Sequence, residues 1–174
     1  HSLDRRQRQM CIRDSSCIYI IITNKKLKKK IDIEKVATID IGSNAIRLLI
    51  SNVFSLDGEL YHTKNSFYRV QLRLGDDSFK RGIISDINKE KLISTLKSFK
   101  LLMDVNDVKK YLAYATSAMR GINDSKKIIS LIEKHTNIKV EIITGKKESE
   151  IIAKNDISQY VGKAKNYCFI DVGG

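Results

Sequence analysis

Hydrophobic and polar residues alternate along the first half of the folded region, as they do in β-strands with one covered face. The alternation predicts strands at about 36–41, 46–54 and 59–72. Asp57-Gly58, between the second and third runs, is typical of a tight hairpin turn. The pattern therefore predicts three antiparallel strands at the start of the domain, followed by a loop that contains Gly75 and Gly82.

The second half alternates between helical and strand periods. A helix is predicted from Ser85 or Asp86 to about Asp104, because apolar residues recur there at helical spacing: Leu92, Leu96, Phe99 and Met103. The remaining elements are strands at 109–116, 140–144 and 167–172 and helices at 123–135 and 145–160, the last with Ile151 and Ile152 facing inward. The order β-β-β-α-β-α-β-α-β predicts an α/β fold, the ribonuclease-H-like lobe of the actin-like ATPase fold. Its mixed sheet would be flanked by helices.

Two of the predicted strands end in the same short pattern, an acid followed by a glycine turn. Asp40-Ile41-Gly42 leads into Ser43 and Asn44, and the chain finishes on Asp171-Val172-Gly173-Gly174. Backbone N–H groups and small polar side chains in such turns bind anions. A carboxylate at the strand end could hold a hydrated Mg²⁺ beside that anion. The two turns therefore predict two loops that face one phosphate-bearing ligand, with Asp40 and Asp171 on the metal side.

Composition narrows the class of protein and of partner. The chain has 174 residues, 42% hydrophobic and 30% charged, which is typical of a globular domain. Its net charge of +12 favours polyanionic partners. The three cysteines form no C-x-x-C pair and their number is odd, which argues against a disulfide framework and favours the cytoplasm. We expect no membrane and no nucleic acid among the partners.

The two ends of the chain differ from the middle. Residues 1–34 are basic and contain only a seven-residue apolar run, so we expect a disordered or non-native extension there. The first lobe is expected over 35–165. Residues 166–174 would form the first strand and the start of the phosphate loop of a truncated second lobe, because the sequence stops inside a glycine run.

Four motifs, in order over roughly 36–174, give the chain a resemblance to the exopolyphosphatase / guanosine pentaphosphate phosphohydrolase family. They are DIGSNAIRL (40–48), ATSAMR (115–120), IITGKKES (142–149) and DVGG (171–174). The first and last look like the family's two phosphate loops. Lys147 departs from the pattern, since the family often has an acid there, and Ser149 stands where alanine is usual.

The resemblance implies a Mg²⁺-dependent enzyme that removes terminal phosphate from inorganic polyphosphate or guanosine pentaphosphate. Glu148 would be the catalytic base and Arg120 would grip the phosphate. The phosphate-binding set would be Gly42, Ser43, Asn44, Thr116, Ser117, Gly173 and Gly174, with Asp40 and Asp171 at the metal. The resemblance does not choose between the two substrates, and it leaves the oligomeric state open, a homodimer included.

Other interpretations remain open on the residues alone. Arg120 fits a surface ion pair equally well, and Glu148 fits an ordinary acid in the first turn of a helix. A kinase or ATPase of the same superfamily would share both phosphate loops. A non-catalytic module that binds polyanions would explain the charge without any chemistry.

Overall fold

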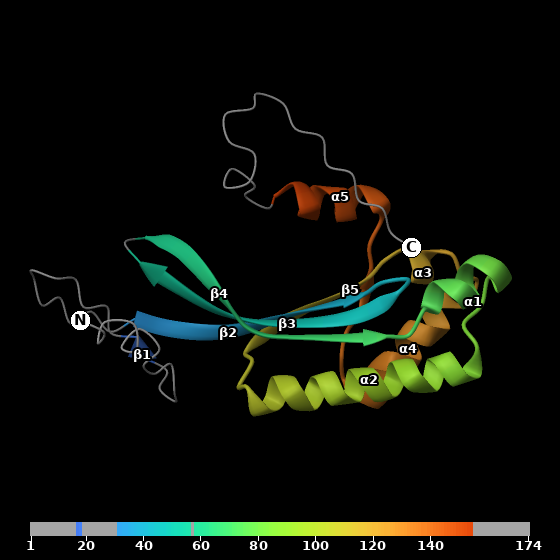
Figure 1. Cartoon of the computed structure of the whole chain (residues 1–174), viewed down its shortest axis with the longest axis horizontal. Coiled ribbons are helices and arrows are strands. Elements are labelled where there is room, and N and C mark those ends of the chain that lie inside the picture. Colours follow the sequence, from blue (N-terminus) through green and yellow to red (C-terminus); the bar gives the residue numbers. More distant parts are fainter. Residues whose placement is uncertain (1–16, 19–30, 57, 155–174) are drawn as a thin grey trace, which may run out of the picture.

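The computed structural model describes residues 17–18, 31–56 and 58–154. Figure 1 shows a sheet with two long helices along one face and a third helix standing above the other. In chain order the elements are β1 (Cys17–Ile18), β2 (Ile31–Ile41), β3 (Ala45–Leu56), β4 (Glu59–Gln71), α1 (Leu74–Arg81), α2 (Asp86–Val105), β5 (Lys110–Ala115), α3 (Ser117–Arg120), α4 (Ser125–Thr136), β6 (Glu141–Ile142) and α5 (Gly145–Ala153).

The sheet has the order β4-β3-β2-β5-β6, and β1 pairs with β2 outside this path. The pairs β2–β3 and β3–β4 are antiparallel, whereas β2–β5 and β5–β6 are parallel. The predicted mixed sheet, with three antiparallel strands followed by parallel β/α units, is therefore confirmed. The helices and loops that follow the parallel strands all leave from one edge of the sheet.

One face of the sheet is covered by α2 and α4 and forms the hydrophobic core. Ile39 of β2, Leu48 of β3 and Ala113 of β5 point to this face and are buried. The predicted core residues of α2 are all buried against them: Leu92, Leu96, Phe99 and Met103. In α4, Ile128 and Ile132 join the same core.

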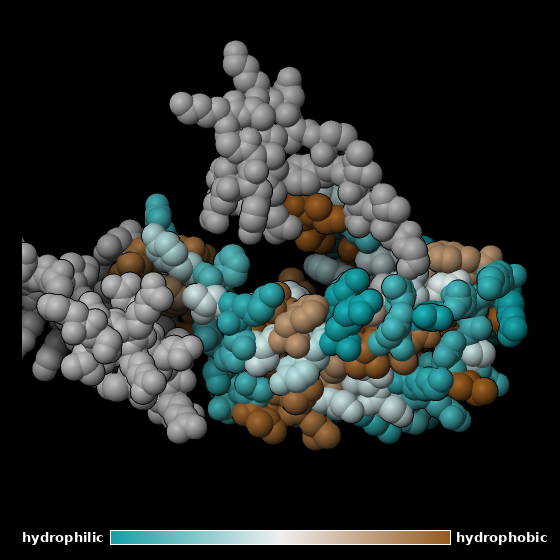
Figure 2. Space-filling view, in the orientation of Figure 1, coloured by the Kyte–Doolittle hydropathy of each residue, from teal (hydrophilic) through white to brown (hydrophobic). Residues whose placement is uncertain are grey.

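The opposite face of the sheet, which we call the open face, carries two rows of cross-strand neighbours. The first row is charged and polar and runs Arg69, Arg47, Asp40, Tyr114 and Glu141. The second is largely apolar and runs Phe67, Leu49, Thr38 and Leu112. Phe67 and Leu112 are 50% and 55% exposed. Figure 2 shows the molecule hollowed between this face and α5.

Several predictions about individual elements were wrong. The loop expected around Gly75 and Gly82 is largely the helix α1, which ends at a left-handed Gly82. The four-residue α3 was not predicted. Ile151 is 40% exposed and α5 has no buried residue, because the described part of this helix stands away from the strands (Figure 1).

The expected boundary at residue 34 also falls inside an element. β2 begins at Ile31, and residues 31–34 are part of the sheet. Residues 31 and 32 pair with β1, and residues 33 and 34 continue the antiparallel ladder with β3. The predicted strand at 167–172 lies outside the described residues. Within the described ranges, no helix is long and apolar enough to cross a membrane.

Candidate active site

The candidate residues gather where the three parallel strands end. Thr116, just after β5, donates its backbone N–H to the carbonyl oxygen of Ile41 at 3.2 Å, and Ile143, just after β6, donates to Ala115 at 3.0 Å. These bonds hold the ends of β2, β5 and β6 side by side. The segments that follow the strands carry the predicted phosphate loop, Arg120 and Glu148. Ligands of open α/β sheets bind at this edge.

The predicted phosphate loop, Gly42 to Asn44, is a tight turn fixed by the chain that follows β4. Gly42 N–H donates to the Ala45 carbonyl at 3.1 Å, and a methyl group at Gly42 would lie only 3.1 Å from that oxygen. The Ser43 carbonyl accepts from Gly75 N–H at 2.8 Å. The Asn44 carbonyl accepts from the backbone of Arg73 at 2.9 Å. The turn is therefore held in place before any ligand arrives.

Asp40 forms an ion pair that the sequence did not reveal. Its Oδ2 accepts from Nη1 of Arg47 at 2.5 Å, and both side chains are 42% exposed. The two residues are direct partners across the β2–β3 hairpin. Asp40 is the candidate metal carboxylate, and the described residues hold no group of three or more potential metal ligands. One carboxylate is enough for Mg²⁺, which keeps several waters and usually takes its other ligands from substrate phosphates.

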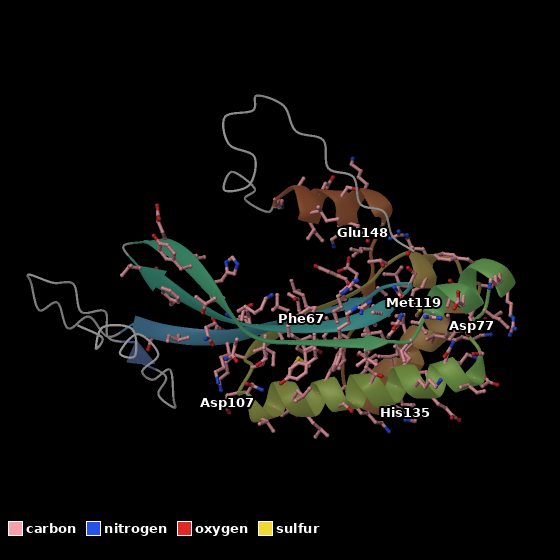
Figure 3. All side chains as sticks on the ribbon, viewed as in Figure 1. Phe67, Asp77, Asp107, Met119, His135 and Glu148 are labelled. Atoms are coloured by element: carbon pink, nitrogen blue, oxygen red, sulfur yellow. The ribbon has the colours of Figure 1, made fainter. Side chains whose placement is uncertain are left out.

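The two predicted catalytic residues are in contact. Nη1 of Arg120 donates to Oε2 of Glu148 at 2.9 Å and to the carbonyl oxygen of Ile143 at 2.8 Å. Figure 3 shows Glu148 at the start of α5, on the side of the molecule where Met119 marks α3. Arginine carries five N–H donors in a fixed fork, and both of these bonds use Nη1. The guanidinium can therefore hold Glu148 and still offer Nη2 and Nε to an anion.

The start of α5 sets the direction of Glu148. Thr144 is the N-cap, and its Oγ1 accepts from Lys147 N–H at 3.2 Å. Lys147 turns to the open face, where its Nζ bonds Glu141 at 2.6 Å and lies 5.2 Å from the centre of the Tyr114 ring. The hydrogen bond that Lys147 donates to the Glu141 carboxylate raises the pKa of Lys147. Lys147, which departs from the family pattern, thus neutralises an acid of the open face.

The structure describes some of the remaining predicted site residues and not others. Thr116 is 7% exposed and precedes α3, where its carbonyl accepts from Met119 and Arg120. Ser117, the first residue of α3, is half-buried beside it. Asp171, Gly173 and Gly174 lie outside the described residues, so the convergence of the two Asp-x-Gly loops stays a prediction.

A hollow beside the phosphate loop contains residues that sequence reasoning missed. It has a volume of about 280 Å³ and is lined by Ser43, Asn44, Gln71, Arg73, Gly75, Asp76 and Phe79. Arg73 has φ 53° and ψ 45°, a left-handed conformation that is uncommon for arginine. The available signal in the sequence was Gly75, two residues after Arg73 and shortly after the end of β4, but we predicted a loop there.

Comparison with known proteins matches residues 64–174 to the model of the Ppx/GppA phosphatase family. The chain belongs to this family. The family's solved structures share the fold described above. The Aquifex aeolicus Ppx/GppA protein superimposes with a TM-score of 0.61 at 30% identity, over 67% of this chain and 37% of that one. An exopolyphosphatase from Cytophaga hutchinsonii gives 0.61 at 28% identity, over 68% and 36%.

Curated Ppx/GppA relatives are similar over most of this chain and a smaller part of their own length. Exopolyphosphatase 1 of Mycobacterium tuberculosis is 26% identical over 140 residues, which is 80% of this chain and 40% of the relative. The bifunctional 3-dehydroquinate synthase/phosphatase of Fusobacterium nucleatum is 32% identical over 143 residues, 79% of this chain and 21% of the relative. The chain thus spans less than half the length of the relatives that it matches.

Proposed function

We propose that the protein hydrolyses terminal phosphoanhydride bonds of inorganic polyphosphate or guanosine pentaphosphate, in the cytoplasm and with Mg²⁺. The observation that carries the proposal is the Arg120–Glu148 contact at the end of β5 and β6. It joins a guanidinium, which can bind phosphate, to a carboxylate that can activate water. The names of the mycobacterial and Cytophaga relatives support a hydrolase over the kinase alternative.

Each residue has a role that follows from its chemistry. Glu148 would hold a water in line with the terminal phosphorus and accept its proton as the oxygen attacks. The bond from phosphorus to the bridging oxygen breaks, which releases orthophosphate and a shortened chain. Arg120 keeps Glu148 in position through Nη1 and would contact phosphate oxygens with its other N–H groups. Phosphoryl transfer depends chiefly on such positioning and charge stabilisation.

The phosphate loop would bind the phosphates next to the one that leaves. Gly42 forms the tight turn with its N–H bonded to the Ala45 carbonyl, Ser43 would offer its backbone N–H group, and Ser43 and Asn44 would offer side-chain donors. Asp40 would hold Mg²⁺ together with phosphate oxygens, and Arg47, paired with Asp40, keeps the carboxylate in place. When bound, the ion supplies neutralisation of phosphate charge.

The test is the release of orthophosphate by the full-length protein, with both candidate substrates. Glu148→Gln should lower kcat about a hundredfold or more, as expected for the loss of a general base. Glu150→Gln is the matched control, since Glu150 is an exposed acid of the same helix. Full activity of Glu148→Gln would contradict the assignment. Salt-dependent binding of polyphosphate with no release of phosphate would favour the polyanion-binding module instead.

A further inference from the structure

We propose that Lys147 is a positioning residue for the candidate base: its ion pair with Glu141 fixes the first turn of α5 to β6, and thereby the direction of Glu148. The inference rests on the proposed function and deepens it by adding a residue that acts through another and does not contact the substrate. Two ion pairs at neighbouring positions of α5 carry it. Lys147 binds Glu141, and Glu148 binds Arg120.

Helix α5 is held in place differently from α2 and α4. None of the residues described for it, Gly145–Ala153, is buried, and Ile151 is 40% exposed. Figure 1 shows α5 above the open face, whereas α2 and α4 lie along the covered face. Most helices are stabilised by the packing of one apolar side, and a helix of nine residues is marginal by itself in water. The polar contacts of its first turn therefore decide where α5 lies.

The two ion pairs leave α5 in different directions. Nζ of Lys147 lies 2.6 Å from Oε1 of Glu141, and Nη1 of Arg120 lies 2.9 Å from Oε2 of Glu148. Adjacent helical residues project about 100° apart around the axis, because a turn has about 3.6 residues. With one pair alone the helix could roll about that contact, whereas two divergent pairs fix its rotation. Loss of the Lys147 pair should therefore let Glu148 change direction.

The sheet gives Glu141 a fixed place from which to hold Lys147. Glu141 is the parallel neighbour of Tyr114, and Tyr114 is the parallel neighbour of Asp40, the candidate metal carboxylate. Nζ of Lys147 also lies 5.2 Å from the centre of the Tyr114 ring, within the range of a cation–π contact. Lys147 thus ties the start of α5 to the row of residues that carries Asp40.

The Lys147–Glu141 pair is charged at neutral pH, but its contribution to folding is small. The hydrogen bond that Lys147 donates to Glu141 raises the pKa of Lys147 above its ordinary value of 10.5, so this side chain is protonated. The side chains of Lys147 and Glu141 are 43% and 57% exposed. Ion pairs this exposed add little to the free energy of unfolding, because water screens them. A substitution of Lys147 should thus disturb the position of α5 without unfolding the domain.

The test is the release of orthophosphate by the full-length protein, with kcat and KM measured separately. Lys147→Met should lower kcat about three- to fivefold, as much as one partly exposed ion pair can contribute, and leave KM unchanged. Lys146→Met is the matched control, because it removes the same charge from the exposed neighbouring position and should leave kcat unchanged. Lys147→Arg, which keeps the charge, should retain most of the activity.

Reversal of the two charges separates positioning from a general effect on the structure. Lys147→Glu alone sets two carboxylates against each other and should lower kcat further. Lys147→Glu combined with Glu141→Lys should restore kcat to within about twofold of wild type, because the pair forms again. A rise of KM with kcat unchanged would show that Lys147 contacts the substrate, and would overturn the proposal. An unchanged kcat in Lys147→Met, or a charge reversal that restores nothing, would also overturn it.

A second measurement separates the failure of this proposal from that of the proposed function. If the wild-type protein releases phosphate from neither substrate, the proposed function is wrong, and hydrogen exchange of the backbone N–H groups of α5 decides the role of Lys147 alone. Lys147→Met should speed this exchange by about threefold or more, because a detached helix of nine residues frays. The charge reversal should slow it again. Exchange in Lys147→Met at the wild-type rate would overturn the proposal.

Discussion

On one face of the sheet, α2 and α4 bury Ile39, Leu48 and Ala113. On the other face, β2 and β3 place Thr38, Asp40 and Arg47 where solvent reaches them. Neighbouring residues of a strand point to opposite faces, so the two sets alternate one by one along the chain. Ile39 is 1% exposed, whereas the side chain of Asp40 is 42% exposed.

The difference shows that folding stability depends chiefly on the covered face, while the groups that a ligand could contact lie on the open face. Burial of apolar side chains on the covered face supplies the free energy that holds the strands in register. The open face contributes little to that free energy, because its ion pairs are partly exposed and screened by water. It is therefore free to carry charges that a ligand can use. Substitutions on the covered face should therefore mainly change stability, whereas substitutions on the open face should change stability little and mainly affect ligand binding.

The largest expected effect on stability is on the covered face. Leu96→Ala should lower the free energy of unfolding by about 2–5 kcal/mol, because Leu96 is fully buried and its loss leaves a cavity. Leu101→Ala, on the same helix at a site 66% exposed, is the control and should change it by less than about 0.5 kcal/mol. Urea denaturation measures both. Equal losses would mean that the outer surface of α2 is packed in solution.

A smaller effect on stability is expected at the edge of the sheet, beside the phosphate loop. Gly75→Ala should cost about 1–3 kcal/mol by overpacking, because its Cβ would lie 2.9 Å from the Phe79 ring and 3.0 Å from Cβ of Ser43. Gly121→Ala is the control, since its Cβ would have only an ordinary contact at 3.7 Å. Thermal unfolding distinguishes them, and a neutral Gly75→Ala would show that Phe79 and the loop can move apart.

A third effect depends on pH and concerns the joint between α1 and α2. Oδ2 of Asp77 accepts from the Ser85 hydroxyl at 2.6 Å, from Ser85 N–H at 2.9 Å and from Asn88 Nδ2 at 2.8 Å. These bonds, the one from the Ser85 hydroxyl foremost, lower the pKa of Asp77 below its ordinary value of 3.8. The stabilisation is thus present above pH 3.8 and is lost as the pH falls through the lowered pKa.

Asp77→Asn should therefore be less stable than wild type by about 0.5–1 kcal/mol at neutral pH, a figure reduced for solvent screening. The difference should shrink below pH 3.8. Urea titrations at several pH values measure it. Asp104→Asn, which removes an exposed partner of Lys100, is the control, and a difference for Asp77→Asn that is independent of pH would contradict this account.

The smallest effect on stability is expected on the open face. Arg47→Met keeps the length of the side chain and removes the ion pair with Asp40, which should change the free energy of unfolding by less than about 1 kcal/mol. Binding of pyrophosphate in the presence of Mg²⁺ should nevertheless weaken. A loss of stability as large as that of Leu96→Ala would show that the open face is not separate from the core.

Much of the fold was predictable because its signals are local. Alternation located β2, β3 and β4, and helical spacing located all four core residues of α2. Helix α1 was missed because Gly75 and the acids Asp76 and Asp77 are typical of a loop, whereas here the acids occupy the first turn of a helix of eight residues. Ile151 was predicted to face inward because periodicity shows that a helix has an apolar side and does not show what covers it.

The candidate site was predictable in its polar residues and not in their pairing. Glu148 and Arg120 were selected from motifs 28 residues apart, and only the parallel alignment of β5 and β6 explains their contact. Arg47 was missed as the partner of Asp40 because hairpin register decides which residues face each other. Phe79 and Arg73 were missed because the hollow that they line depends on the turn into α1, where local propensity failed.

Strand β2 has antiparallel β3 on one side and parallel β5 on the other, so its register is fixed from both directions. A slip of a single position would turn Asp40 inward among aliphatic groups and push Ile39 out into water. The strand cannot misalign the acid without dismantling the hydrophobic interior. Any sequence change that preserves this interior will therefore also keep Asp40 pointing toward the ligand side.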